Sequence, residues 1–184
     1  MTTMHTKLWE PSPERIAQAN ITAFAALIEA KHHVDVDTYA RLWQWSVDHK
    51  WDFWREVWDY GGVLGTPGER VLLDADRMPG ARWFPDARLN FAQNLLERRR
   101  ADDADDAIVF WGEDKVRRVL SHADLHALAS RVAAAFAAHG VKAGDRVAAF
   151  LPNMPEAIVA MLGATANGAI WSSCSPDFGV QGVV

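Results

Sequence analysis

The chain has 184 residues, a length that suits one domain or slightly more than one. Hydrophobic residues make up 49% of it and charged residues 23%, which excludes an intrinsically disordered chain. The formal net charge of −5 argues against a surface that binds nucleic acid or an anionic membrane.

The sequence indicates a reducing, cytoplasmic location. Cys174 is the single cysteine, so neither an internal disulfide nor a cysteine cluster for zinc is expected. The first ten residues contain no apolar stretch, which predicts that there is no secretory signal. The longest apolar segment, 157–171, is interrupted by polar residues and glycine, and a membrane span needs about 20 apolar residues.

The N-terminal part of the chain is typical of short helices. The run Ser12-Pro13-Glu14 predicts a helix start, because serine can cap, proline fits the first turn and glutamate suits the positive end. Asn20 and Asp37 are the candidate caps of two further helices, each followed by apolar residues at helical spacing. Gly61-Gly62 predicts the end of the last helix in this part.

Tryptophan is unusually frequent, with nine residues in the chain. Five of them fall in one short stretch: Trp43, Trp45, Trp51, Trp54 and Trp58. The last three are spaced i, i+3 and i+7, which places them on one helical face. We interpret the stretch as an aromatic-rich helical core, with a stripe that binds sugar or lipid as the alternative.

Residues 64–82 contain glycine, proline and aspartate and predict an irregular connector that lies on a larger element. A short helix is expected over 90–96. In residues 97–106 three arginines are followed by acidic residues, so the local charge largely cancels. This run is interpreted as a solvated helix end and linker rather than as a nucleic-acid site.

From residue 107 onward the pattern is α/β. Strands over 107–111 and 116–120 predict a hairpin, and Ser121 then caps a helix that ends at Gly140, with Asp124 completing an imperfect capping box. Strands over 146–151 and 169–174 flank a helix over 156–167. This order predicts a parallel strand pair with a right-handed crossover.

The familiar phosphate-binding and nucleophile motifs do not occur in the sequence. His122 and His126 have the i, i+4 spacing of zinc ligands, but Ala123 stands where a metalloprotease has glutamate, so surface histidines are the preferred interpretation. Cys174 is interpreted as an inert core thiol.

Residues 171–179 leave the carboxyl end of a predicted parallel strand, which is where ligands bind in such sheets. The turn at Pro152-Asn153 also follows a strand. For both segments the alternative is an ordinary strand-to-loop transition.

Several segments resemble the adenylate-forming acyl-CoA synthetases. Residues 125–151, with the sequence GVKAGDRVA at 140–148, resemble the first core motif of that family, and residues 152–157 and 161–164 resemble its continuation. Residues 39–46 with Phe53-Trp54 resemble the N-terminal cap of short-chain members. Residues 81–96 and 171–179 resemble the members that act on acetoacetate.

The resemblance implies an α/β fold. A helical N-terminal cap, residues 1–100, precedes the first strands and helices of a large adenylation domain, residues 101–184, which is truncated. It implies a ligase of fatty acid metabolism that uses ATP, Mg²⁺ and coenzyme A. Acetoacetate attacks the α-phosphate of ATP to give an acyl-adenylate and pyrophosphate, and the thiol of coenzyme A then attacks the acyl carbonyl.

The same resemblance assigns four residues to coenzyme A binding. Ser175, Pro176, Asp177 and Phe178 match the loop that lies near the pantetheine tunnel in acetyl-CoA synthetases, which have glycines where Pro176 and Asp177 stand. The 184 residues of this sequence contain no counterpart of the family's phosphate loop, metal-binding acid, ribose-binding aspartate or adenylation lysine. No catalytic or metal-binding residue is therefore assigned.

We expect the N-terminal piece of a longer ligase, inactive alone, whose partner is the missing C-terminal portion of the same enzyme. Open strand edges in such a piece favour self-association. The alternatives to this function are an acetyl- or propionyl-CoA synthetase and a non-catalytic module that binds a partner through its Trp-rich region. A small nucleotide-binding module ranks last.

Overall fold

The computed structural model describes residues 8–97, 104–113 and 115–183. The chain divides into two compact units: residues up to 63 together with 67–86 form the first, and residues 64–66 together with those from 87 onward form the second. The division falls ahead of the boundary at residue 100 that the resemblance implies, because residues of the helix at 91–97 pack with two later helices.

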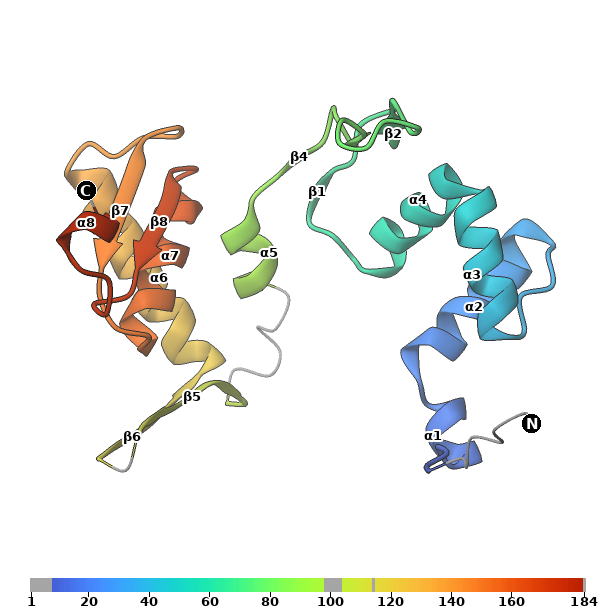
Figure 1. The fold of residues 1–184 in the computed structure, drawn as a ribbon, viewed down its shortest axis with the longest axis horizontal. Helices are drawn as coiled ribbons and strands as arrows, with labels where there is room; N and C mark the ends of the chain where they lie inside the picture. The colour runs from blue at the N-terminus through green and yellow to red at the C-terminus, as the bar shows by residue number, and fades with distance from the viewer. Residues whose placement is uncertain (1–7, 98–103, 114, 184) are drawn as a thin grey trace. The chain divides into compact units, whose positions relative to one another are not determined.

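The first unit is mainly helical (Figure 1). Its two short strands pair antiparallel, with Leu72 opposite Trp83. Its elements are α1 (Pro13–Ala17), α2 (Asn20–His32), α3 (Tyr39–Asp48), α4 (Lys50–Tyr60), β2 (Leu72–Leu73) and β3 (Arg82–Trp83).

The helix starts of this unit are only partly as predicted. The Ser12 hydroxyl accepts a hydrogen bond from the Arg15 backbone N–H at 3.3 Å, which confirms that cap. Asn20 and Asp37 are wrong as caps, since Asn20 lies inside α2 and Thr38 caps α3. Thr38 has the extended backbone that a capping residue needs, and its hydroxyl accepts from the backbone N–H of the residue three positions on.

An aromatic core holds the helices of the first unit together. Its buried residues are Phe24, Ile28, Val36, Leu42 and Trp45, with Phe53 packed against them. The predicted aromatic core is thus confirmed for Trp45. It is wrong for Trp43, Trp51 and Trp54, which are 53%, 49% and 40% exposed. Trp43 lies one position past Leu42, on the side of α3 away from this core.

The tryptophans of α4 hold the connector that follows the helix. The Trp51 indole N–H donates to the carbonyl of Leu72 at 3.3 Å, and the rings of Trp54 and Trp83 are 5.3 Å apart in an edge contact. The expectation of a connector lying on a larger element is confirmed. The connector is less irregular than predicted, because it contains β2 and β3.

The second unit has three longer helices and two longer strand pairs among its described elements (Figure 1). The bounds are β1 (Gly65–Thr66), β4 (Arg88–Leu89), α5 (Phe91–Glu97), β5 (Asp106–Gly112), β6 (Val116–Ser121), α6 (His122–Ala138), β7 (Arg146–Phe150), α7 (Pro155–Ala166), β8 (Ile170–Cys174) and α8 (Val180–Val183). Strands β1 and β4 pair antiparallel. In the predicted linker at 97–106, residues 98–103 lie outside the described residues.

The predicted hairpin is confirmed as the antiparallel pair β5–β6. Ser121 closes β6 and caps α6, and the capping box is complete rather than imperfect. The Ser121 hydroxyl accepts from the Asp124 backbone N–H at 3.1 Å, and the Asp124 carboxylate accepts from the Ser121 backbone N–H at 3.1 Å. Hydrogen bonding to Ser121 holds the pKa of the Asp124 carboxyl below its usual value.

Helices α6 and α7 pack closely around a core of Ala92, Leu125, Ala129, Val159 and Leu162. Gly163 permits this approach, because a Cβ at that position would lie 2.6 Å from Cγ1 of Val132. No helix in the described part of the chain is long and apolar enough to cross a membrane.

Candidate functional site

Two loops meet at the carboxyl edge of the β7–β8 pair. The strands are parallel as predicted, and their last residues, Phe150 and Cys174, are partners in the register. The pairing continues one step further, since the Leu151 backbone N–H donates to the Cys174 carbonyl at 3.4 Å. The turn over 152–154 and the loop over 175–178 therefore leave the same edge of the sheet, which is where α/β sheets bind ligands.

The loop that follows β8 is a closed turn. The Ser175 hydroxyl hydrogen-bonds to the Asp177 carboxylate at 3.0 Å and accepts from the Asp177 backbone N–H at 3.2 Å. The Phe178 backbone N–H donates to the Ser175 carbonyl at 3.1 Å. Pro176 is exposed, and the Phe178 side chain is 55% exposed.

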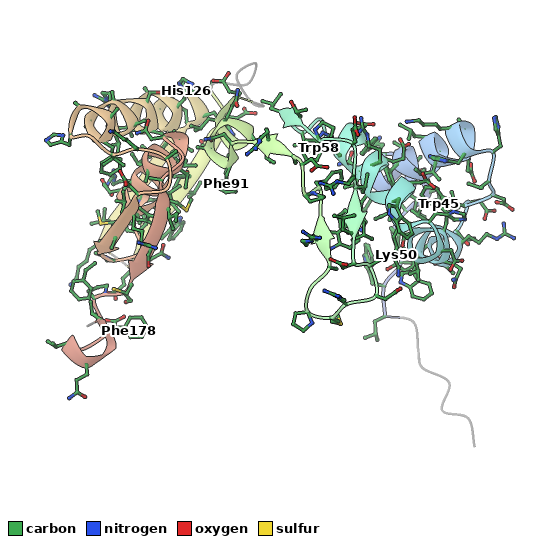
Figure 2. The ribbon with its side chains drawn as sticks, turned by 90° about the horizontal axis from the view of Figure 1, so that it is seen from above. Trp45, Lys50, Trp58, Phe91, His126 and Phe178 are labelled. Carbon is green, nitrogen blue, oxygen red and sulfur yellow. The ribbon has the colours of Figure 1, made fainter. Side chains whose placement is uncertain are left out.

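Phe178 lies beyond the end of β8, at the opposite end of the second unit from His126 (Figure 2). The sequence-predicted residues Ser175 to Phe178 are thus brought together in one turn at the edge of the sheet. The turn offers a hydroxyl, a carboxylate and an exposed aromatic face. Such a set can contact a ligand with polar and apolar parts.

An ion pair connects the hairpin to the helix that follows the other loop. Arg118 of β6 donates to a carboxylate oxygen of Glu156, in the first turn of α7, at 2.7 Å. This hydrogen bond is the main reason that the pKa of the Glu156 carboxyl lies below its usual value. The pair was not predicted from the sequence, because the two residues are 38 positions apart and belong to no common motif.

The histidines with zinc-ligand spacing do not assemble a metal site. His126 Nε2 lies 3.5 Å from a carboxylate oxygen of Glu97. Among the described residues no group of three or more His, Cys, Asp or Glu side chains could hold a metal ion. The described residues therefore do not fit a Mg²⁺ site.

Cys174 is a free, half-buried thiol at the end of β8. Its Sγ lies 3.8 Å from the Ala149 carbonyl oxygen of the neighbouring strand. Cys174 is thus less enclosed than the core position that the sequence predicted.

The first unit holds a buried carboxylate that the sequence analysis did not single out. Glu56 of α4 is 4% exposed, and its oxygens lie 2.8 Å from Lys31 Nζ and 3.1 Å from His32 Nε2, both on α2. His32 is the last residue of α2, at the negative end of the helix dipole, which favours a basic side chain. The cluster ties α2 to α4, so its evident role is to hold the helices together.

Comparison with known protein families gives two adjoining matches, which divide within α5 rather than at the boundary of the two units. Residues 39–95 match the family described as the acetyl-coenzyme A synthetase N-terminus, and residues 96–184 match the family described as AMP-binding enzyme. The two matches adjoin, and together they run from residue 39 to residue 184. The α/β fold expected from the resemblance is confirmed.

Several proteins similar to this chain are named acetoacetyl-CoA synthetases. The acetoacetyl-coenzyme A synthetase of Rhizobium meliloti (strain 1021) is 47% identical over 177 residues, which is 96% of this chain and 27% of that protein. The acetoacetyl-CoA synthetase of Macaca fascicularis is 36% identical over 179 residues, 96% of this chain and 26% of that protein.

A solved structure of an acetoacetyl-CoA synthetase is also similar to this chain. The acetoacetyl-CoA synthetase from Streptomyces lividans matches with a TM-score of 0.86 and 42% identity, over 97% of this chain and 28% of that protein. The chain thus spans about a quarter of the length of the curated relatives it matches.

Proposed function

We propose that these residues form the N-terminal part of an ATP-dependent acid–thiol ligase that joins acetoacetate to coenzyme A through an acyl-adenylate. The observation that carries the proposal is the 47% identity along 96% of the chain with a curated acetoacetyl-coenzyme A synthetase. In this proposal residues 1–100 form the helical N-terminal region and residues 101–184 begin the adenylation domain.

The proposed ligase takes ATP, Mg²⁺, acetoacetate and coenzyme A, and it functions in fatty acid metabolism. Of these, only coenzyme A is assigned a contact within this chain, at Ser175, Pro176, Asp177 and Phe178. What supports the assignment is the position of the turn at the carboxyl edge of parallel strands and the exposed ring of Phe178. The unpaired Cys174 fits a reducing compartment, and we propose the cytoplasm.

A chimeric enzyme tests the proposed function. This chain replaces the matching quarter of the Rhizobium meliloti relative, and formation of acyl-CoA is measured with acetoacetate, acetate and propionate. We expect turnover with acetoacetate in preference to the other acids, at the ratio shown by the parent enzyme. The 184-residue chain alone, assayed in parallel, should form no acyl-adenylate.

Two outcomes would refute the proposal. A folded chimera without turnover would show that these residues cannot serve such a ligase. A preference that moves towards acetate or propionate, compared with the parent, would favour an acetyl- or propionyl-CoA synthetase.

The coenzyme A contact has its own test in the same chimera. Asp177→Ala and Phe178→Ala should each raise the KM for coenzyme A while the KM for ATP stays unchanged. Val183→Ala, which alters an exposed position of α8 outside the turn, serves as the control. An unchanged KM for coenzyme A in both site variants would remove the assignment.

A further inference from the structure

Helix α7 ends on Asn167, and the residue that follows makes Asn167-Gly168 the single Asn-Gly sequence of the chain. Asparagine before glycine is especially prone to lose its side-chain amide, because glycine has no side chain to hinder the approach of its backbone nitrogen to the asparagine Cγ. Gly168 is exposed and Asn167 is half-buried, so water reaches this position.

The fold needs both residues of this sequence. Gly168 has φ +74°, and a Cβ there would lie 3.0 Å from Cβ of Ala143, so glycine fits and larger residues do not. The Asn167 side-chain amide donates a hydrogen bond to the carbonyl of Ala133 in α6 at 2.8 Å. Asn167 therefore ties the end of α7 to α6, and the chemically sensitive sequence is a consequence of the packing.

The reaction needs water and no other reagent. The Gly168 backbone nitrogen loses its proton and forms a bond to Cγ of Asn167, while the bond between Cγ and Nδ2 breaks and ammonia leaves. Water then opens the cyclic imide at either of its two carbonyls. The product at position 167 is aspartate or isoaspartate, according to which carbonyl is attacked.

In the folded chain both reacting groups are held by hydrogen bonds. The Gly168 N–H donates to the Thr165 carbonyl at 2.9 Å, and the Asn167 amide is held by Ala133. Both bonds must break before the nitrogen and Cγ can meet. The first closes the end of α7, and the second breaks when α7 moves away from α6.

The closest packing of the two helices lies one turn before this tie. Gly163 and Asn167 are four positions apart, which places them on one face of α7. A Cβ at Gly163 would lie 3.1 Å from the backbone nitrogen of Ala133, the residue whose carbonyl Asn167 binds. A movement that separates the helices at Gly163 therefore also releases the Asn167 amide.

We propose that Asn167 is a site of spontaneous deamidation and that separation of α6 and α7 controls the rate of the reaction. Because ring closure is slow compared with opening and closing of the helices, its rate follows the population of the opened state. The proposal concerns the second unit alone and does not depend on the proposed ligase function.

The product removes the tie that restrained the reaction. A carboxylate at position 167 cannot donate to the Ala133 carbonyl, and it places a negative charge at the negative end of the α7 dipole. Isoaspartate also adds one backbone atom ahead of Gly168, within the loop closed by the hydrogen bond from the Ala169 N–H to the Ala164 carbonyl at 3.1 Å. Deamidation therefore makes the separation of the helices persistent.

Incubation of the 184-residue chain at mildly alkaline pH tests the site. Mass spectrometry of digests measures amide loss at each asparagine, and enzymatic methylation with a protein-isoaspartate methyltransferase measures isoaspartate. A synthetic peptide of residues 161–171 gives the unrestrained rate. We expect the folded chain to react about tenfold or more slower than the peptide, and the chain in denaturing urea to react at the peptide's rate. Asn153, which is exposed but precedes methionine, should stay intact as the internal reference.

Two outcomes would overturn this part of the proposal. A peptide that keeps its amide would show that Asn167 is not a deamidation site. Equal rates in the peptide and the folded chain would show that the fold does not restrain the reaction.

Gly163→Ala and Ala134→Gln separate control by the helices from a local effect. The first adds the Cβ that clashes with α6, whereas the second changes an exposed position of α6 and keeps its helix propensity nearly unchanged. Hydrogen exchange of 122–138 and 155–166 is measured on the same samples, and low urea concentrations open the parent without a substitution. Deamidation and exchange should rise by a common factor in Gly163→Ala and in urea, and both should stay at the parent level in Ala134→Gln. Deamidation that changes without exchange, or exchange without deamidation, would refute control by the helices.

The effect of the product is tested with a matched pair of acid variants. Asn167→Asp places the carboxylate against the Ala133 carbonyl, whereas Asn153→Asp places it in the exposed turn at the sheet edge. Asn167→Asp should speed exchange in α6 and α7 by about fivefold or more, since it leaves the carbonyl without its donor, and Asn153→Asp should not. Equal exchange in the two variants would show that the amide of Asn167 does not hold the helices together.

Discussion

Replacing Gly163 by alanine should weaken the α6–α7 pair, although alanine is the better helix former. The added Cβ would lie 2.6 Å from Cγ1 and 2.9 Å from Cβ of Val132, and 3.1 Å from the backbone nitrogen of Ala133. Neither Cβ of Val132 nor the nitrogen of Ala133 can rotate away. The clash can therefore be relieved only if the two helices move apart.

The two opposing effects can be compared in size. Alanine gains about 1 kcal/mol over glycine in a helix interior. Overpacking a close contact costs about 1–3 kcal/mol, and contact with backbone atoms places this site in the upper part of that range. The net loss is then about 1–2 kcal/mol, which corresponds to hydrogen exchange about 5- to 30-fold faster in the helices concerned.

Hydrogen exchange measured by mass spectrometry on peptides from 122–138 and 155–166 tests this estimate, with α2 as the internal reference. A double-mutant cycle with Val132→Ala sharpens the test, because that change removes the 2.6 Å contact and should reduce the penalty of Gly163→Ala. Slower exchange in Gly163→Ala would refute the reasoning, since helix propensity would then outweigh packing. Additive effects in the cycle would show that Cγ1 of Val132 is not the obstacle.

Three further predictions concern polar contacts. Glu56→Ala should destabilise the first unit by about 1–3 kcal/mol in unfolding followed by tryptophan fluorescence; the loss stays below that of a fully buried pair because Lys31 is 55% exposed. An unchanged unfolding midpoint in Glu56→Ala would contradict this prediction. Ser121→Ala should cost about 1 kcal/mol and speed exchange in the first turn of α6, and exchange unchanged there would exclude a capping role. An NMR titration should find the Glu156 carboxyl pKa below its usual value, and Arg118→Met should raise it. Because the folded pKa is the lower one, the pair stabilises the fold above the unfolded-state pKa and loses this effect as the pH falls through the folded value. The stability difference between Arg118→Met and the parent should therefore vanish in acid, and a difference that persists there would rule out the ion pair as its source.

Local signals in the sequence predicted the second unit well. The hairpin, the Ser121 cap and the parallel pair follow from alternation, capping chemistry and the strand–helix–strand order, which depend on neighbouring residues. The candidate turn at 175–178 was placed correctly at the carboxyl edge for the same reason. A parallel crossover fixes which end of the strands the loop must leave.

Features that depend on tertiary position were not predictable. Asp37 and Thr38 are both good capping residues, and the backbone conformation at Thr38 decided between them. The burial of Glu56 depends on how α4 meets Lys31 and His32 of α2, which no spacing along the chain encodes. Likewise, Trp45 became buried and Trp43 exposed because of the direction in which α3 presents its apolar side.

Helix α7 links the packing of the second unit to the geometry of the candidate site. Its first residue, Pro155, is buried, and its last carbonyls accept hydrogen bonds from the Asn90 side chain at 2.9 Å and 3.2 Å. The middle of α7 packs closely against α6 at Gly163, and Arg118 forms an ion pair with Glu156 in the first turn of α7. The turn at 152–154 is the direct extension of this helix, so its position at the sheet edge is set by contacts made elsewhere. Loosening α7 should therefore shift the turn at 152–154, and with it the edge where coenzyme A is proposed to bind, even where no residue of the loops has been changed.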